Sequence, residues 1–229
     1  MRVRLRFSKH GKVRFTSHRD VARMWERALR RASLPVTYSE GFSPRPRLHF
    51  GLALPTGYES EGEYLDVDLV DEPQMPLSAL PGILTPCLPD GMVVQAAGPV
   101  AAGTDSLQHA VTSCTWLIEV AGVTPEALGA AVERALAAET LPITRERKGR
   151  EVTDDLRPAI IALTVGALRL TAELGTQPRG VRPSELLRVL DPTLEEVRVI
   201  RIHQWTAVDG TPEEPLAVAS TPHAEVRAS

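Results

Sequence analysis

Residues 26–37 read ERALRRASLPVT, and residues 133–144 read ERALAAETLPIT. The two segments are identical at seven of twelve positions, with an offset of 107 residues. Downstream of them, the pairs Arg45-Pro46 and Arg157-Pro158 each lead into an apolar run. A match within a repeated succession of elements indicates an internal duplication. We therefore predict that the chain contains the same unit twice.

The residues around the first copy predict a unit of strands and helices. Apolar and basic residues alternate over residues 2–7, which is typical of a strand with one buried face, and the alternation resumes over 13–15. Ser17 and Asp20 have the spacing of a helix capping box, and apolar residues at helical spacing follow them. The remaining expected elements are strands over 48–54, 64–69 and 92–97 and a short helix over 77–84.

The second half repeats this order, with a strand over 115–120, a helix from 124, a strand over 167–173, a short helix over 183–190 and a strand over 197–205. We predict an α+β protein of two tandem ferredoxin-like (split βαβ) units, residues 1–100 and 112–208, related by internal duplication. Residues 98–113 contain the expected linker. Residues 209–229 show no sustained period, which predicts a disordered tail.

The overall composition excludes several classes of protein. The 229 residues are 43% hydrophobic, and no stretch approaches the ~18 uninterrupted apolar residues of a membrane span. The start, MRVRLRF, lacks the apolar stretch of a signal peptide. Cys87 and Cys114 are too few for a disulfide framework, a cysteine-rich zinc site or an iron–sulfur cluster. We expect a reduced cytoplasmic protein with no membrane contact and no cofactor bound by this chain.

The net charge of −3 conceals a strong segregation of charge along the chain. Residues 1–50 contain 13 Lys and Arg and three acidic residues, a net charge of +10. Residues 51–100 contain eight acidic residues and no Lys or Arg, a net charge of −8. All four Phe residues also lie within residues 1–50. A basic and aromatic segment indicates a surface that faces a polyanion, unless it pairs with the acidic segment of the same chain.

Two groups of residues are candidates for that surface. The first is the basic set Arg2, Arg4, Arg6, Lys9, Lys12, Arg14, Arg19 and Arg23, whose alternative role is ion pairing with the acidic residues of 59–68. The second is the loop 41–47, GFSPRPR, in which two prolines stiffen the backbone around Arg45. There Phe42 either stacks on a base or caps the core. The predicted nucleic-acid contacts are Arg14, Arg19, Arg23, Tyr38, Phe42, Arg45 and Arg47.

The sequence carries no established catalytic or metal-binding motif. GxxxxGK[ST], GxGxxG, GxSxG and CxxxCxxC are all absent, which argues against nucleotide hydrolysis, a Rossmann cofactor site and a radical cluster in this chain. HxH, HxxxH and CxxC are absent too, so no metal site is predicted. His18 and His49 are candidates for general acid–base catalysis, but no fixed spacing joins them.

A succession of short motifs supports a family assignment. It consists of Ser17-His18-Asp20, Glu26-Arg27-Ala28-Leu29, Tyr38-Ser39, Gly41-Phe42, Pro44, Pro46 and Glu63-Tyr64-Leu65-Asp66. Over residues 2–70 it resembles the radical SAM-linked proteins, a bacterial family whose domain has no known function. A second, less extensive likeness is KGREVTDDLRPAI at 148–160.

The resemblance implies a partner rather than a chemistry. Members are encoded beside, or fused after, a cobalamin-binding radical SAM protein, and no catalytic residues are implied. The predicted fold is also similar to that of RNA-binding CRISPR repeat-processing proteins, which is an analogy at the level of fold only. We expect an accessory RNA-binding module that acts with a separate radical SAM protein in RNA or ribosome-related modification, without independent catalytic activity.

Two alternatives remain open from the sequence. In one, the chain is a protein-only adapter whose basic face docks on an acidic surface of the radical SAM partner. In the other, it is a metal-independent ribonuclease that uses His18 or His49.

Overall fold

The computed structural model describes residues 1–217 except 72, 74, 148 and 209; residues 218–229 lie outside the description. The first half contains β1 (Arg2–Lys9), α1 (His18–Arg31), β2 (Leu48–Phe50), β3 (Glu59–Asp68), α2 (Leu80–Leu84) and β4 (Met92–Pro99). Short 3-10 segments occupy Gly11–Phe15, Leu77–Ala79 and Thr85–Cys87. The prediction of a strand over 13–15 is therefore wrong, because a tight 3-10 turn takes these residues from β1 to α1.

The second half begins with the short helix α3 (Leu107–Ala110), which leads directly into β5. Its remaining elements are β5 (Val111–Ala121), α4 (Pro125–Ala137), β6 (Pro142–Arg147), β7 (Arg150–Asp155), β8 (Ile160–Gly166), β9 (Arg169–Gly175), α5 (Pro183–Leu190), β10 (Glu195–Val208) and β11 (Thr211–Glu213). A 3-10 turn at Arg157–Ala159 precedes β8. No helix among the described residues is long and apolar enough to cross a membrane.

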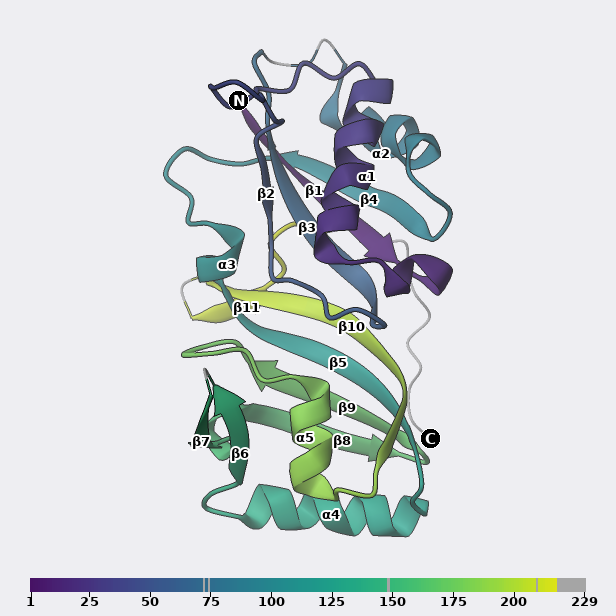
Figure 1. The fold of residues 1–229 in the computed structure, drawn as a ribbon, viewed down its shortest axis with the longest axis vertical. Coiled ribbons are helices and arrows are strands. Elements are labelled where there is room, and N and C mark those ends of the chain that lie inside the picture. Colours follow the sequence, from purple (N-terminus) through teal and green to yellow (C-terminus); the bar gives the residue numbers. More distant parts are fainter. Residues whose placement is uncertain (72, 74, 148, 209, 218–229) are drawn as a thin grey trace.

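One nine-stranded sheet runs through both halves (Figure 1). Its order is β4-β1-β3-β10-β5-β9-β8, with β2 paired to β3 and β11 paired to β10. The halves meet where β10 pairs with β3 in parallel, with Ile200 opposite Glu59 and Arg201 opposite Ser60. The described pairings within each half are antiparallel. The predicted α+β class is confirmed as a large mixed sheet with few helices.

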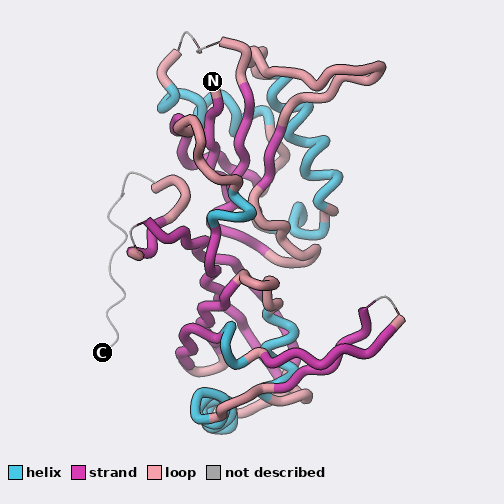
Figure 2. Tube along the Cα trace, turned by 90° about the vertical axis from the view of Figure 1, so that its left-hand side faces the viewer, coloured by secondary structure: helices cyan, strands magenta, loops and turns pink. Residues whose placement is uncertain are grey.

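Both halves have the same strand order. The order in the first half is β4-β1-β3-β2, and the order in the second half is β10-β5-β9-β8. In each half, one helix follows the first strand and another precedes the last strand. The β6–β7 hairpin is an addition between α4 and β8 (Figure 2).

Each half has its own hydrophobic core. In the first half, Trp25 of α1 is fully buried and meets Phe7 of β1 edge-on, with ring centroids 4.9 Å apart. In the second half, α4 and α5 cover a cluster that includes Ile118, Leu128 and Leu186. The two clusters explain why the helices of each half lie against their own part of the sheet (Figure 1).

Helix α1 begins as its sequence predicts. The Ser17 hydroxyl accepts a hydrogen bond from the backbone N–H of Asp20 and donates one to the Asp20 carboxylate. The buried residues Val21, Trp25, Ala28 and Leu29 form the predicted apolar stripe. Because this stripe takes one face of the helix, the arginines of α1 lie on the solvent side.

The segments predicted as linker and tail contain more regular structure than expected. The end of β4, all of α3 and the start of β5 lie within residues 98–113. Residues 211–213 form β11, because they pair with the end of β10, and Glu214 then forms an ion pair with Arg6. The rest of the predicted disordered tail, residues 218–229, lies outside the described residues.

Candidate functional site

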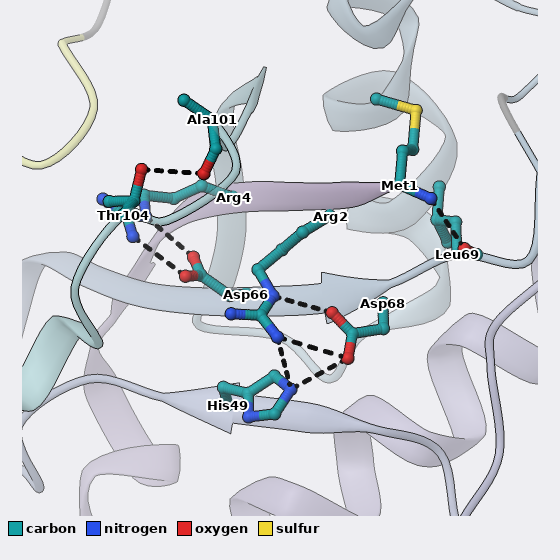
Figure 3. A network of polar contacts seen from close by, with 9 residues as sticks. All are labelled: Met1, Arg2, Arg4, His49, Asp66, Asp68, Leu69, Ala101 and Thr104. Carbon is teal, nitrogen blue, oxygen red and sulfur yellow. Dashed lines mark hydrogen bonds and ion pairs between the residues drawn. The ribbon is translucent and has the colours of Figure 1, made fainter.

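Two arginines of β1, Arg2 and Arg4, are paired with acidic residues of β3 (Figure 3). Antiparallel pairing places Arg2 opposite Asp68 and Arg4 opposite Asp66. Each pair has an Nε to Oδ1 distance of 2.7 Å. Side chains directly opposite each other on neighbouring strands are close enough to pair. For this part of the basic set, the alternative of ion pairing within the chain is the one found.

Three further basic residues are also engaged within the chain. Arg6 pairs with Glu214, and Arg14 pairs with Glu59 at 3.2 Å. Lys9 is buried and donates a hydrogen bond to the carbonyl oxygen of Thr16 at 3.3 Å. Burial lowers the pKa of the Lys9 ammonium group. Arg14 is thus a predicted nucleic-acid contact whose guanidinium already has an internal partner.

The exposed face of α1 has a different character. Its five exposed arginines are Arg19, Arg23, Arg27, Arg30 and Arg31. Arg23 reaches Asp20 at 3.5 Å, one turn away on the helix surface. Within the described part of the chain, the other four have no ion pair. This face therefore carries positive charge that the protein itself neutralises only slightly.

The α1–β2 connection forms a projecting loop beside this face (Figure 2). The backbone N–H of Ser39 donates to the carbonyl oxygen of Arg45 at 2.8 Å, and the N–H of Arg47 donates to that of Thr37 at 2.8 Å. Gly41, with φ of 122°, makes the turn that a side chain would strain. Phe42 at the tip is fully exposed, so the alternative in which it caps the core is wrong.

Three of the predicted contacts line one cavity. Arg19 and Arg23 line it from α1 together with Glu26, and Arg45 lines it from the loop. Its volume is about 180 Å³. We call these three residues the arginine cluster. Arg47 and Tyr38 are exposed in the same loop but do not line this cavity.

The arginine cluster is suited to bind an anion. Guanidinium groups cannot lose their protons in proteins, so their mutual repulsion is relieved by a counter-charge. Two carboxylates oppose the three guanidinium groups, because Glu26 lines the cavity and Asp20 pairs with Arg23, so one positive charge is left in excess. Guanidinium also matches the geometry of phosphate oxygens with two parallel hydrogen bonds.

The two candidate histidines lie near each other although the sequence gives them no common spacing. His18 and His49 line one cavity of about 380 Å³ between the start of α1, β2 and α3. The Nε2 atom of His49 lies 3.1 Å from an oxygen of Asp68 (Figure 3). Burial would raise the pKa of Asp68, but the hydrogen bonds from Arg2 and His49 outweigh burial and hold that pKa below its usual value.

A buried ion pair at the junction of the halves has no signal in the sequence. Arg201 of β10 is fully buried, and its guanidinium contacts both carboxylate oxygens of Glu63 at 2.6 and 2.7 Å. A cavity of about 510 Å³ lies beside it and is lined in part by Cys114 and Trp116. Burial raises the pKa of the Cys114 thiol to about 11, so this thiol stays protonated at neutral pH.

No group of three or more His, Cys, Asp or Glu side chains is placed to hold a metal ion in the part of the chain that the structure describes. The adjacent carboxylates Asp154 and Asp155 illustrate why. Asp154 contacts the guanidinium groups of Arg145 and Arg179, while Asp155 accepts backbone hydrogen bonds.

The family model described as an uncharacterized protein conserved in bacteria (DUF2344) matches residues 2–185. The chain belongs to this family. The match includes α1, the projecting loop and both candidate histidines, so the whole arginine cluster lies within the DUF2344 region. Strand β10, which joins the two halves of this DUF2344 protein, follows the matched residues. No curated protein matches the chain.

Proposed function

We propose that this DUF2344 protein is an accessory module that binds RNA through the exposed face of α1 and the adjoining loop. The observation that carries this proposal is the arginine cluster: Arg19, Arg23 and Arg45 line one cavity, and among the described residues only Arg23 forms an ion pair. The fully exposed Phe42 stands in the same loop as Arg45.

These two features fit single-stranded RNA better than a small anion. A polynucleotide offers phosphates at regular intervals, and each phosphate contact releases counterions into solution. Its unpaired bases also present flat faces, which stack on exposed aromatic rings. Phe42 and Tyr38 are the rings available for stacking, and Arg47 adds an exposed positive charge.

We further propose that the module works with a separate cobalamin-binding radical SAM protein in RNA or ribosome-related modification. This part rests on the resemblance over residues 2–70. The remaining surface for a partner lies on the second half, where residues 101–229 contain 13 basic and 18 acidic residues. In this arrangement the module holds RNA at one end and the partner at the other.

The shared strand order also supports the finer fold prediction. We propose that the two halves are ferredoxin-like units related by duplication. In both, the fourth strand neighbours the first, the first neighbours the third, and the third neighbours the second. The Arg-Pro pairs of the sequence repeat precede the equivalent strands β2 and β8.

The test of RNA binding is its dependence on salt. The dissociation constant for bacterial transfer RNA and ribosomal RNA is measured by filter binding over a series of salt concentrations. The variant Arg19→Ala/Arg45→Ala is compared with Arg150→Ala/Arg188→Ala, which removes two exposed arginines of the second half. For single-stranded contacts, loss of two phosphates lowers the slope of log K against log salt by about 1.4.

The outcomes separate RNA binding from the adapter role. A weakened and less salt-dependent affinity in the first variant only supports the proposal. Affinity that is independent of salt, or equal in both variants, overturns RNA binding by the arginine cluster. Co-purification of a radical SAM protein without nucleic acid, lost in Arg19→Ala/Arg45→Ala, would instead establish the protein-only adapter.

A further inference from the structure

The cavity of His18 and His49 combines groups that can transfer protons with a group that binds anions. Imidazole is the commonest general acid or base in enzymes because it exchanges a proton near neutral pH. Arg2 lines the same cavity and carries a permanent positive charge. The cavity volume of about 380 Å³ leaves room for part of a nucleotide.

The carboxylate of Asp68 fixes the orientation of His49 (Figure 3). Nε2 of His49 lies 3.1 Å from a carboxylate oxygen of Asp68 and 3.4 Å from Nη2 of Arg2. We place the ring hydrogen on Nε2, because the contact with Asp68 is the shorter one and a carboxylate can only accept a hydrogen bond. In the neutral ring, Nδ1 then carries the lone pair that accepts a proton. The negative charge of Asp68 stabilises the imidazolium that forms on acceptance, as the carboxylate of a catalytic triad does.

His18 connects this cavity to the arginine cluster. It is the first residue of α1, its ring is exposed and packs edge-on against Phe50 with centroids 5.0 Å apart, and Arg19 is the next residue. Successive side chains of a helix point in different directions, so the RNA strand has to pass from Arg19 around the start of α1 to bring a phosphodiester to the ring of His18. Arg2 lines the same cavity, and its Nε and Nη2 atoms contact Asp68. Its Nη1 atom makes no hydrogen bond with the described residues and is the one that can hold an oxygen of that phosphodiester.

We propose that this cavity is an acid–base site that cleaves a phosphodiester bond of the bound RNA without a metal ion. The inference rests on the proposed function, because the arginine cluster is what holds the RNA next to the cavity. His18 and His49 are the catalytic residues, Arg2 stabilises the charge on the phosphate, and Asp68 is a positioning residue.

The step is an internal transfer of the phosphoryl group. The ribose 2′-oxygen attacks the adjacent phosphorus while Nδ1 of His49 accepts the proton of the 2′-hydroxyl. The bond from phosphorus to the 5′-oxygen breaks, and the protonated ring of His18 gives its proton to that oxygen. The products are a 2′,3′-cyclic phosphate and a 5′-hydroxyl end. The step consumes no oxidant and no water molecule, and it requires no metal ion.

Cleavage is tested on purified bacterial transfer RNA and ribosomal RNA in the presence of EDTA, with the 5′-hydroxyl ends mapped. We expect His18→Ala and His49→Ala each to lower the cleavage rate by at least about 100-fold, the size of a general acid–base contribution. His109→Ala, which removes an exposed histidine outside the cavity, is the matched control and should cleave at the normal rate. Equal rates in all three variants overturn the proposal.

A modified substrate distinguishes the two roles. An oligonucleotide that spans the mapped position and carries sulfur in place of the bridging 5′-oxygen has a leaving group that needs no proton. It should restore cleavage by His18→Ala and leave His49→Ala inactive. Rescue of both variants, or of neither, contradicts the assigned roles. A 2′-deoxynucleotide at the mapped position should bind normally and resist cleavage.

Failure of this inference can be distinguished from failure of the proposed function. If RNA binds with the salt dependence expected of the arginine cluster and is not cleaved, the acid–base site is overturned and RNA binding stands. If RNA does not bind at all, the proposed function is overturned first. Circular dichroism spectra and thermal unfolding like those of the unchanged protein show that His18→Ala and His49→Ala are folded.

Discussion

Arginine residues of the same chain have opposite roles depending on what lies opposite them. Arg4 on β1 meets Asp66 across the strand pair and is buried with it. Arg19 and Arg45 are exposed and form no ion pair within the described part of the chain. The first kind of arginine contributes to the fold, because a buried charge must keep its partner. The second kind is available to a ligand.

The buried pair of Arg4 and Asp66 predicts a large loss of stability when one partner is removed. Asp66→Ala leaves the Arg4 guanidinium buried without its counter-charge, so we expect the free energy of unfolding to fall by about 3–5 kcal/mol. Urea unfolding followed by tryptophan fluorescence measures the change. Glu119→Ala, which breaks the exposed pair with Arg169, is the control and should cost no more than about 1 kcal/mol.

Asp68 predicts a dependence of stability on pH. Its pKa is lower in the folded than in the unfolded chain, so its ionised form stabilises the fold above the unfolded value of about 3.9. This contribution disappears as the pH falls through the lower folded pKa. The stability difference between the protein and Asp68→Asn should therefore shrink from neutral pH to about pH 3. Urea unfolding over this pH range measures it, and a constant difference would contradict the prediction.

Helix α1 is the element that links the fold to the candidate site. One face supplies Trp25 to the core, and the other supplies Arg19 and Arg23 to the arginine cluster. The projecting loop is held by backbone hydrogen bonds at its base, so Arg45 is presented from a defined position. A substitution that destabilises α1 or the loop should therefore displace the arginines of the cluster, although all three keep their positive charge.

Substitution of the N-cap residue of α1 tests how much this helix end contributes to stability. Ser17→Ala removes the hydroxyl that accepts the Asp20 N–H, and we expect a loss of about 1 kcal/mol of stability. Ser17→Asn keeps an oxygen at the cap and should retain most of that stability. Thermal unfolding followed by circular dichroism compares the two. Equal losses in both variants would show that the cap contributes little.

The two halves are joined by a short parallel contact between β3 and β10 and by side-chain contacts, among them those of Arg201, Arg198 with Glu59, and Tyr58 with Glu196. Besides Glu63, the Arg201 guanidinium holds the carbonyl oxygen of Leu52 at 2.8 Å. One side chain of the second half thus contacts a strand and a loop of the first. The halves have separate cores, so this junction determines whether they unfold together.

Arg201→Met tests this coupling. It leaves the Glu63 carboxylate buried without a partner, and we expect a loss of about 3–5 kcal/mol and a broader unfolding transition. Calorimetry measures both effects. Arg201→Met/Glu63→Leu removes both charges of the pair, so part of the lost stability should return, although the nearby buried Lys9 then loses the Glu63 carboxylate. A double variant no more stable than Arg201→Met would show that the ion pair does not determine the coupling.

How much could be predicted from the sequence depended on the range of the interactions. Helix α1 was predictable because Ser17 and the apolar stripe around Trp25 act within a few turns. The nearness of His18 and His49 was not, because it arises from the packing of β2 beside the start of α1. The pairing of Arg201 with Glu63 was equally hidden, because it joins strands from opposite halves. Alternation over 13–15 could not distinguish a strand from a 3-10 turn.

Strand β10 also has a consequence for the order of events during synthesis on the ribosome. Residues 1–99 contain every strand of the first half, yet part of the β3 edge gains its neighbour only when residues 200 and 201 have been translated. One edge of β5 also remains unpaired until β10 has been translated. Nascent chains therefore carry two unpaired strand edges until late in translation, and such edges invite pairing with other chains.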